Sequence, residues 1–202
     1  MISLDMANVT GYDAGRLLKG SIIPRPVAFI TSLSEDHVLN GAPFSYFTIV
    51  STEPPLIAIS VQRTDGKLKD TSRNILSKKS FVVHVVDEKN VEQINETAAT
   101  LPPDVSEVEL AKLTIAPSLK IPVAGVREAK IRMECVLEEV FALGDKDNPA
   151  CDLIIGRVVQ FYVDEDVYEN GRINASKLEA ISRLAGSNYA KTGSIFEVKR
   201  PE

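Results

Sequence analysis

The sequence predicts a mainly β fold, an antiparallel barrel with added helices rather than a parallel sheet. Six or seven short runs are rich in the β-branched and aromatic residues that favour strands. Helix-like segments lie between some of these runs but do not alternate with them, as a βαβ arrangement would require. The 11 Pro and 11 Gly favour many turns. No linker divides the chain, so residues 1–202 are expected to form one domain.

The predicted strands are separated by turn residues. Residues 27–33 (VAFITSL) and 38–42 flank a short turn, which predicts a hairpin. Pro54 and Pro55 predict a corner, because proline cannot donate to a strand ladder. Gly156 predicts a bulge or a close approach within the last long strand. Further strands are expected at residues 44–50, 56–61, 81–86, 130–143, 153–163 and 195–199.

The predicted helices are short. The first segment is a helix or turn whose pattern places Leu17 and Leu18 on a buried side. The second begins at Asp70 or Thr71, either of which can cap it, and turns Ile75 inward. These segments are expected at residues 11–22, 70–78, 91–100 and within 101–113.

Composition and charge argue against several classes of protein. Lys and Arg number 23 and Asp and Glu number 28, so the net charge is 23 − 28 = −5, which argues against nucleic acid as the main partner. No apolar run approaches the roughly 20 residues of a membrane span. The N-terminal residues lack the pattern of a signal peptide. Cys135 and Cys151 show no CxxC spacing, so we expect free buried thiols and a cytoplasmic location.

The sequence offers no catalytic or metal-binding motif. It has no Gly-x-Ser-x-Gly elbow, no Walker loop and no GxGxxG. Glu138 and Glu139 are adjacent on a strand and so point to opposite faces, which does not support paired-carboxylate catalysis. His84 has no second His or Cys at ligand spacing, so it is interpreted as a structural histidine, and His37 as a solvent-facing turn residue. We therefore predict no catalytic residue and no metal ligand.

A basic loop followed by a helix has two interpretations. Arg63 and Lys69 supply charge, Thr71 supplies a hydroxyl group, and a helix start leaves backbone N–H groups unpaired. With Asn74 they match a dianionic phosphate in number and type. The alternative is a solvated loop in which Asp70 or Thr71 is an ordinary N-cap.

The preceding segment, residues 40–46 (NGAPFSY), also has two interpretations. Gly41 permits a backbone conformation that other residues resist, and Pro43 keeps the chain extended. Backbone amides there, with Ser45 as a further donor, can hydrogen-bond a planar heterocycle. The alternative is a plain β-turn with a satisfied serine.

The order of these motifs resembles one family. RPVAFITS, NGAPFSYFTIVSTEPPLIAISV, KDTSRNI and FVVHVV follow one another as in the FMN-binding split-barrel proteins of the flavin reductase-like family. The tail ISRLAGSNYAKTG is similar to the closing segment of that family, so the resemblance covers the chain from about Gly20 onwards. It implies a six-stranded antiparallel split β-barrel with peripheral helices. It also implies a homodimer with FMN near the interface, NAD(P)H as electron donor, and a partner monooxygenase or another electron acceptor.

The resemblance also implies a cofactor site, residue by residue. It assigns the isoalloxazine and ribityl region to Asn40, Ala42, Pro43, Ser45 and Tyr46. It assigns the phosphate to Val61, Arg63, Lys69, Thr71 and Asn74. It assigns the completion of the pocket to Arg25, Arg183, Gly186 and Tyr189. Short-chain flavin reductases often end in a Gly-Arg-x-x-His-like motif, whereas this region reads SRLAGSNY, so a nicotinamide site of that kind does not carry over.

Three functions follow as hypotheses. The leading one is an FMN-dependent NAD(P)H oxidoreductase in which the flavin performs the redox chemistry and the protein binds and orients it. The second is a non-catalytic FMN electron carrier similar to flavoredoxins, which the missing histidine favours. The third is a barrel that has lost flavin and binds another small molecule, against which Lys69, Thr71 and Asn74 argue.

Overall fold

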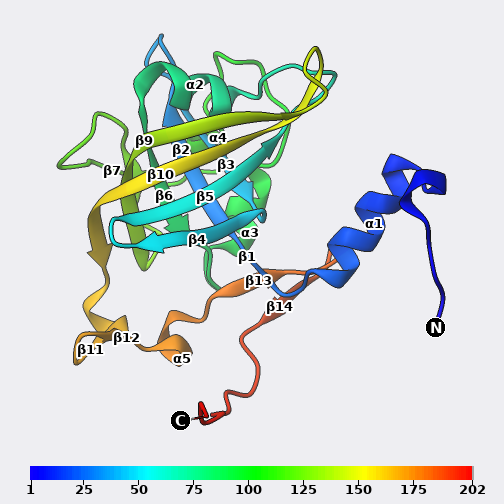
Figure 1. The fold of residues 1–202 in the computed structure, drawn as a ribbon. Helices are drawn as coiled ribbons and strands as arrows, with labels where there is room; N and C mark the ends of the chain where they lie inside the picture. The colour runs from blue at the N-terminus through cyan, green and yellow to red at the C-terminus, as the bar shows by residue number, and fades with distance from the viewer. Residues whose placement is uncertain (202) are drawn as a thin grey trace.

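The computed structural model describes residues 1–201, and its main feature is one large sheet that curls into a barrel (Figure 1). The strands of this sheet are β2 (Ala28–Leu33), β3 (Leu39–Phe44), β4 (Phe47–Thr52), β5 (Pro55–Gln62), β6 (Ser80–Val85), β9 (Ile131–Gly144) and β10 (Pro149–Val163). Their order is β3-β2-β6-β9-β10-β5-β4, and every neighbouring pair is antiparallel. β3 also contacts β5, so the sheet curls back on itself.

The mainly β fold is confirmed, with seven strands in the sheet where the resemblance implies six. The hairpin of β2 and β3 forms as predicted, with Leu33 paired to Leu39. The proline corner also forms, and it folds β4 back on β5 so that Thr52 pairs with Pro55. β4 is thereby an additional edge strand, and it begins at Phe47 rather than residue 44, because Phe44 still belongs to β3.

Gly156 is both a bulge and a close approach, as its position in a strand predicts. The register of β9 and β10 shifts between Ile155 and Gly156. A Cβ atom added to Gly156 would lie 2.4 Å from Cζ of Phe81 on β6, which is separated from β10 by β9 in the sheet. Only glycine allows the Phe81 ring to lie this close to β10.

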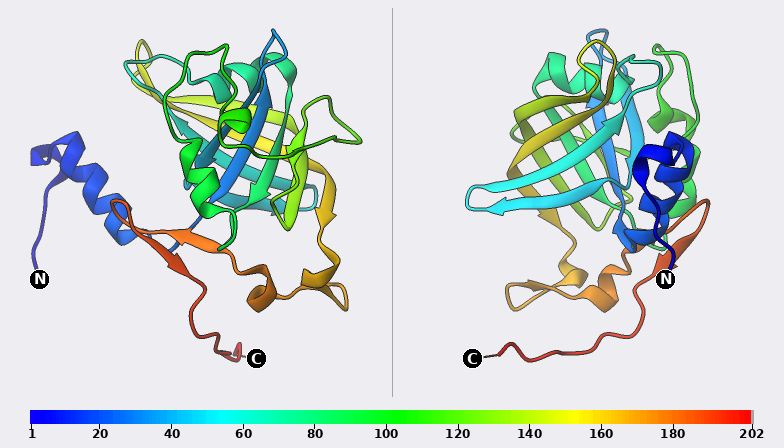
Figure 2. Two further views of the ribbon diagram at one scale, coloured as in Figure 1. Left: turned by 180° about the vertical axis from the view of Figure 1, so that it is seen from behind. Right: turned by 45° about the vertical axis from the view of Figure 1, so that its right-hand side comes forward.

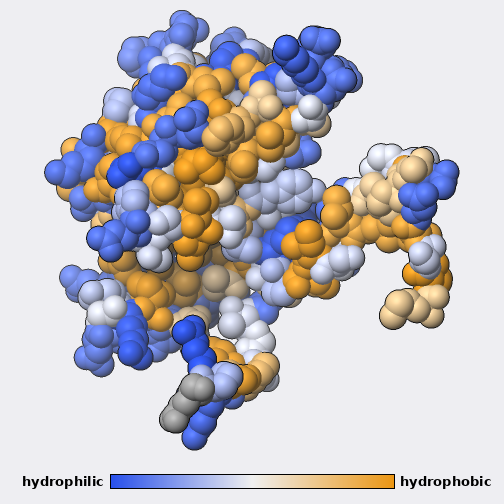
Figure 3. Space-filling view, viewed as in Figure 1, coloured by the Kyte–Doolittle hydropathy of each residue, from blue (hydrophilic) through white to orange (hydrophobic). Residues whose placement is uncertain are grey.

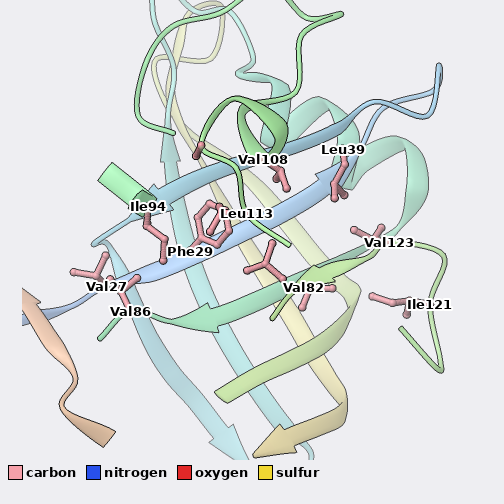
Figure 4. Packing of buried hydrophobic residues seen from close by; sticks show 12 residues of the cluster. Val27, Phe29, Leu39, Val82, Val86, Ile94, Val108, Leu113, Ile121 and Val123 are labelled. Carbon is pink, nitrogen blue, oxygen red and sulfur yellow. The ribbon is translucent and has the colours of Figure 1, made fainter. Parts of the chain in front are cut away.

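Alternation along the strands produces two hydrophobic cores, one on each face of the sheet. Ala28 and Ile30 of β2 belong to the core that also contains Phe81. Val27 and Phe29 belong to the other core (Figure 4). Successive side chains of a strand point to opposite faces, so a continuous apolar run such as VAFI serves both cores.

Short helices cover the second core. Ile94 of α3 (Val91–Glu96) and Val108 of α4 (Glu107–Leu110) lie near Phe29, as Figure 4 shows. The predicted helix at residues 70–78 is α2 (Asp70–Lys78), and Ile75 is buried as expected. Its predicted cap is wrong, because the N-cap residue is Lys69 and no side chain makes a capping hydrogen bond.

The N-terminal helix leaves the barrel. α1 (Gly11–Ser21) follows a 3₁₀ turn, η1 (Met6–Asn8), and projects away from the sheet (Figure 1 and the left view of Figure 2). Leu17 is 40% exposed and Leu18 59%, so the prediction that they are buried is wrong within a single chain. Much of the helix surface is apolar (Figure 3).

The C-terminal segment differs from the prediction as well. The predicted strand at residues 195–199 is wrong, because that stretch has no regular structure. Instead, β13 (Ile181–Arg183) pairs with β1 (Arg25–Pro26) and with β14 (Tyr189–Lys191) in a small separate sheet. The remaining short elements are β7 (Ile115–Ala116), β8 (Gly125–Val126), η2 (Glu165–Val167), β11 (Tyr168–Glu169), β12 (Arg172–Ile173) and α5 (Ala175–Leu178).

The histidine interpretations are confirmed and one cysteine expectation is not. His84 is fully buried, with Nδ1 3.0 Å from the Phe29 carbonyl and Nε2 2.9 Å from the Val126 amide nitrogen. His37 is an exposed turn residue. Both cysteines are free thiols, but only Cys135 is buried, while Cys151 is partly exposed near the start of β10. No helix within residues 1–201 is long and apolar enough to cross a membrane.

Candidate functional site

Two neighbouring cavities form one groove beside the barrel. Their volumes are about 400 and about 390 Å³, and Pro43, Phe44, Lys69 and Ala98 line both. We name the first the basic cavity. The second is the α2 cavity, because it lies at the helix start at Asp70. Sites for cofactors commonly span about 300–1,000 Å³, so the groove has the capacity for one.

The basic cavity carries positive charge without a counter-charge. Lys19, Arg25, Lys69 and Arg183 line it, whereas no Asp or Glu of residues 1–201 does. The chain as a whole has a net charge of −5, so this positive charge is a local feature. The apolar and aromatic part of the lining includes Val27, Phe44, Tyr46, Leu184 and Tyr189. Such a lining suits a flat molecule that carries negative charge.

Arg25 ties the end of α1 to the C-terminal sheet. Its Nη1 donates to the carbonyl oxygens of Lys19 at 2.9 Å and of Ile22 at 2.5 Å, and its Nη2 donates to that of Leu184 at 2.8 Å. The residue is 7% exposed, and its Nε has no partner within residues 1–201. All three acceptors are neutral carbonyls, so the guanidinium charge beside the cavity has no carboxylate to compensate it.

Arg183 lies across the small sheet from Tyr189, its strand partner. Its Cζ lies 4.4 Å from the centroid of the Tyr189 ring, and its Nη2 donates to the Gly186 carbonyl at 2.6 Å. The stacking holds the guanidinium plane and leaves most of its five N–H donors free.

A buried polar network forms the floor of the α2 cavity. Asn40 Oδ1 accepts from Thr71 Oγ1 at 3.1 Å and from Ser32 Oγ at 3.2 Å. Asn40 Nδ2 donates to Glu107 Oε2 at 2.9 Å, and the Gly41 amide donates to the same oxygen at 3.3 Å. Burial raises the pKa of the Glu107 carboxyl group, despite these hydrogen bonds. The network fixes the side-chain amide of Asn40 in one orientation.

The start of α2 is the other feature of this cavity. Without a side-chain cap, the first-turn N–H groups of the helix lack side-chain acceptors. Thr71, which was one predicted cap, uses its hydroxyl group for Asn40 instead. Lys69 adds a positive charge at the same point, where the two cavities meet. Uncapped amides beside a cation favour an anion such as a phosphate.

Eleven of the fourteen predicted site residues line the groove. In the basic cavity these are Arg25, Pro43, Ser45, Tyr46, Lys69, Arg183, Gly186 and Tyr189. In the α2 cavity they are Asn40, Ala42, Pro43, Lys69 and Thr71. The structure therefore brings the mid-chain and C-terminal motifs together at one site. Their contact with a cofactor remains a prediction.

Three predicted residues lie elsewhere. Arg63 donates through Nε to Asp152 Oδ1 at 3.1 Å and through Nη2 to the same oxygen at 2.5 Å, and it lines neither cavity. Val61 is fully buried in the Phe81 core. Asn74 is buried and donates to Ser32 Oγ at 3.2 Å, so it supports the network rather than the surface of the groove.

Several residues that line the groove were not predicted from the sequence. Lys19 comes from α1, Ser60 and Gln62 from β5, and Glu107 from α4. Lys19, Gln62 and Glu107 lie outside the quoted motifs, and nothing distinguishes Ser60 within its strand-like run, so folding alone brings these residues to the groove. The raised pKa of the Glu107 carboxyl group is a structural signal that the sequence does not carry.

The groove offers little for acid–base or metal chemistry. No group of three or more His, Cys, Asp or Glu within residues 1–201 is arranged to hold a metal ion. The two titratable groups with the strongest burial effects, His84 and Cys135, lie in the interior and line neither cavity. The arrangement is suited to binding and orienting a ligand that brings its own reactivity.

Comparison with known proteins identifies the family. The family model described as flavin reductase like domain matches residues 20–179. The chain belongs to the flavin reductase-like family. Among the relatives of this flavin reductase-like protein, the uncharacterized protein YwrF of Bacillus subtilis is 48% identical over 196 residues, which is 96% of each chain.

Two solved structures are similar over nearly the whole chain. Nitrilotriacetate monooxygenase component B from Bacillus cereus is 60% identical, covers 98% of each chain and has a TM-score of 0.97. The 2-nitrobenzoate 2-nitroreductase NbaA of Pseudomonas fluorescens is 29% identical, covers 99% of this chain and 96% of its own, and has a TM-score of 0.89. The family match ends before β13, so Arg183 and Tyr189 of this flavin reductase-like protein lie outside the matched range.

Proposed function

We propose that this protein binds FMN in the groove and acts as an NAD(P)H-dependent flavin oxidoreductase that passes electrons to an acceptor. The observation that carries the proposal is the groove itself. In a chain of the flavin reductase-like family, one apolar and aromatic cavity adjoins a cation and an uncapped helix start. A flavin mononucleotide needs both environments, the first for its ring and the second for its phosphate.

The protein's own groups then have distinct roles. Val27, Phe44 and Tyr46 pack against the ring, and the backbone of residues 43–46 hydrogen-bonds its polar edge. Lys69 and the first-turn amides of α2 hold the phosphate. When bound, the flavin supplies the hydride and electron transfer, and no protein acid or base is needed for that chemistry.

The phosphate assignment is tested by Lys69→Gln. Loss of one charge-assisted hydrogen bond costs about 1.5–3 kcal/mol, so the Kd for FMN should rise about 10- to 100-fold while that for riboflavin stays nearly unchanged. Quenching of flavin fluorescence measures both affinities. Lys67→Gln is the matched control, because Lys67 lies in the same loop, is exposed and lines neither cavity.

Arg63→Gln completes this test. The resemblance assigns Arg63 to the phosphate, but the structure pairs it with Asp152, so we expect no change in the ratio of FMN to riboflavin affinity. Equal weakening of both ligands by Lys69→Gln would contradict the phosphate assignment. A colourless wild-type protein that binds no added FMN would contradict the proposed function as a whole.

A second candidate is a non-catalytic FMN electron carrier. The segment SRLAGSNY favours it, because it lacks the histidine of the motif with which short-chain flavin reductases often end. Stopped-flow reduction with NADH and NADPH separates the two functions. Rapid reduction of the bound flavin excludes a carrier that depends on a protein donor.

We further propose a homodimer that acts in the cytoplasm, with a monooxygenase as electron acceptor. Support for the dimer is the apolar surface of α1, where Leu17 and Leu18 are 40% and 59% exposed. A second copy is a natural partner for such a surface. Support for the acceptor is the similarity to a monooxygenase component B.

A further inference from the structure

We propose that Lys19, Arg25 and Arg183 form an anion site for the second reactant, so that the molecule reacting with the flavin carries a phosphate or carboxylate group. This inference rests on the proposed function, and it concerns three cations that line the basic cavity but not the α2 cavity. It specifies a class of reactant and the residues that recognise it.

The first step is a balance of charge. Four cations line the basic cavity, and none of them forms a salt bridge within residues 1–201. The proposed flavin phosphate uses Lys69, and an oxidised isoalloxazine ring is neutral. Three positive charges therefore remain without a counter-charge when the cofactor is bound. Cations gathered in a partly enclosed site attract an anion.

The second step is the burial of Arg25. It is 7% exposed, and its Nε is a buried donor without a partner in the described chain. A buried charged donor that lacks a partner carries a free-energy cost, which a bound anion offsets. Its other contacts are to the carbonyls of Lys19, Ile22 and Leu184, which do not cancel its charge.

The third step concerns α1. The C-terminal carbonyls of a helix carry partial negative charge, which would weaken a nearby anion site. Here Arg25 occupies two carbonyls at the end of α1, those of Lys19 and Ile22. The side chain of Lys19, in the last turn of the same helix, also lines the cavity. The end of α1 thus contributes the Lys19 cation to the cavity, while two of its carbonyls are paired with Arg25.

The fourth step is the geometry of Arg183. Its guanidinium stacks on Tyr189 and makes one hydrogen bond, to the Gly186 carbonyl. A guanidinium held in this way presents its remaining donors as a fork that matches a phosphate or a carboxylate. Phosphates of a nicotinamide dinucleotide and the carboxylate of an organic acid are two sources of this shared chemistry.

The test is isothermal titration calorimetry of the FMN-loaded protein with inorganic pyrophosphate and with benzoate. We expect at least one anion to bind, and Arg183→Gln to weaken it about tenfold or more through loss of a charge-assisted hydrogen bond. Arg183→Lys should retain part of the binding. Arg16 is an exposed residue of α1, the helix that carries Lys19, and it does not line the basic cavity. Arg16→Gln should therefore leave binding unchanged.

The two probes distinguish the source of the anion. Pyrophosphate binding, with a similar rise in KM for NADH in Arg183→Gln, identifies the phosphates of the dinucleotide. Benzoate binding alone identifies a carboxylate-bearing acceptor. The FMN-to-riboflavin affinity ratio should be the same in wild type and Arg183→Gln.

Two results would overturn the inference. One is that neither probe binds the FMN-loaded protein. The other is that Arg183→Gln weakens FMN but not riboflavin, which would assign the basic cavity to the cofactor's own phosphate. If the wild type binds no flavin, the proposed function fails separately. In that case, the flavin-free protein could still bind a probe and lose this binding in Arg183→Gln. This result would show an anion site that has no role in flavin chemistry, and it would contradict the second-reactant assignment.

Discussion

In the barrel, Phe81 and Ile59 are fully buried, whereas in α1 the neighbouring residues Leu17 and Leu18 are 40% and 59% exposed. Both regions are rich in apolar residues, but only the strands complete their burial within one chain. The barrel thus contains two buried cores, and α1 is an arm whose apolar side chains the rest of residues 1–201 leaves exposed. An amphipathic pattern therefore predicts that one face of a helix is buried, but it does not indicate which surface covers that face.

The largest effect should come from the barrel core. Phe81→Ala removes a fully buried ring that packs against Gly156, and it should lower the free energy of unfolding by about 3–5 kcal/mol. Urea denaturation followed by circular dichroism measures the loss. Phe141→Ala on β9 is the matched control, because that ring is 49% exposed and its removal should cost far less. Equal losses would show that the barrel core is not the main source of stability.

The next effect concerns pH and the same region. Burial lowers the pKa of His84 to about 4, with a smaller lowering contribution from Arg132. The unfolded chain binds this proton near pH 6.5, so it binds more protons than the folded chain between pH 6.5 and 4. Stability should therefore fall as pH decreases through this window, by about 3 kcal/mol in total.

Urea midpoints at several pH values measure this loss. His84→Gln should lower the free energy of unfolding at every pH, since the Phe29 carbonyl and the Val126 amide lose a well-placed partner. It should also remove the contribution of His84 to the slope of unfolding free energy against pH. The difference between the wild-type slope and the variant slope gives the contribution of His84 separately from that of the acidic groups. An unchanged slope in the variant would contradict a neutral buried His84.

The smallest effect on unfolding should come from the arm. Replacing Leu17 and Leu18 together by Ser should change the unfolding free energy of the isolated chain by only about 0.5 kcal/mol, because both side chains are largely exposed. The same change should shift a dimer towards monomer in light scattering. Leu119→Ser, at a loop position that is equally apolar and more exposed, should leave the assembly state unchanged. A wild-type monomer at working concentration would contradict the dimer.

The sequence predicts the barrel well because its signals are local. The run VAFITSL, the Pro54–Pro55 corner and Gly156 each fix a strand, a turn or a bulge through backbone chemistry that neighbours determine. The C-terminal region depends on pairing with a distant segment, Arg25–Pro26, which no local pattern reveals. The predicted strand at residues 195–199 fails for the same reason, since an apolar run needs a partner strand to pair with.

The candidate site shows the same division. The residues predicted within 40–46 and 69–71 lie in motifs and line the groove, namely Asn40, Ala42, Pro43, Ser45, Tyr46, Lys69 and Thr71. Arg63 was predicted from its charge, but Asp152, 89 positions later, is paired with it. Charge and spacing cannot show which distant carboxylate a cation meets. Glu107 and Lys19 reach the groove only through folding, so their roles are visible only in three dimensions.

The hydrogen bonds of Arg25 have a consequence for assembly. One guanidinium holds both the end of α1 and the carbonyl of Leu184, so the arm and one wall of the basic cavity are mechanically joined. A second copy that captures α1 would therefore also steady the place where the anion binds. By thermodynamic reciprocity, an anion that binds more tightly to the assembled form strengthens assembly by the same factor. Dilution would then lower the activity by dissociating the assembly, and the anionic reactant would counteract this dissociation.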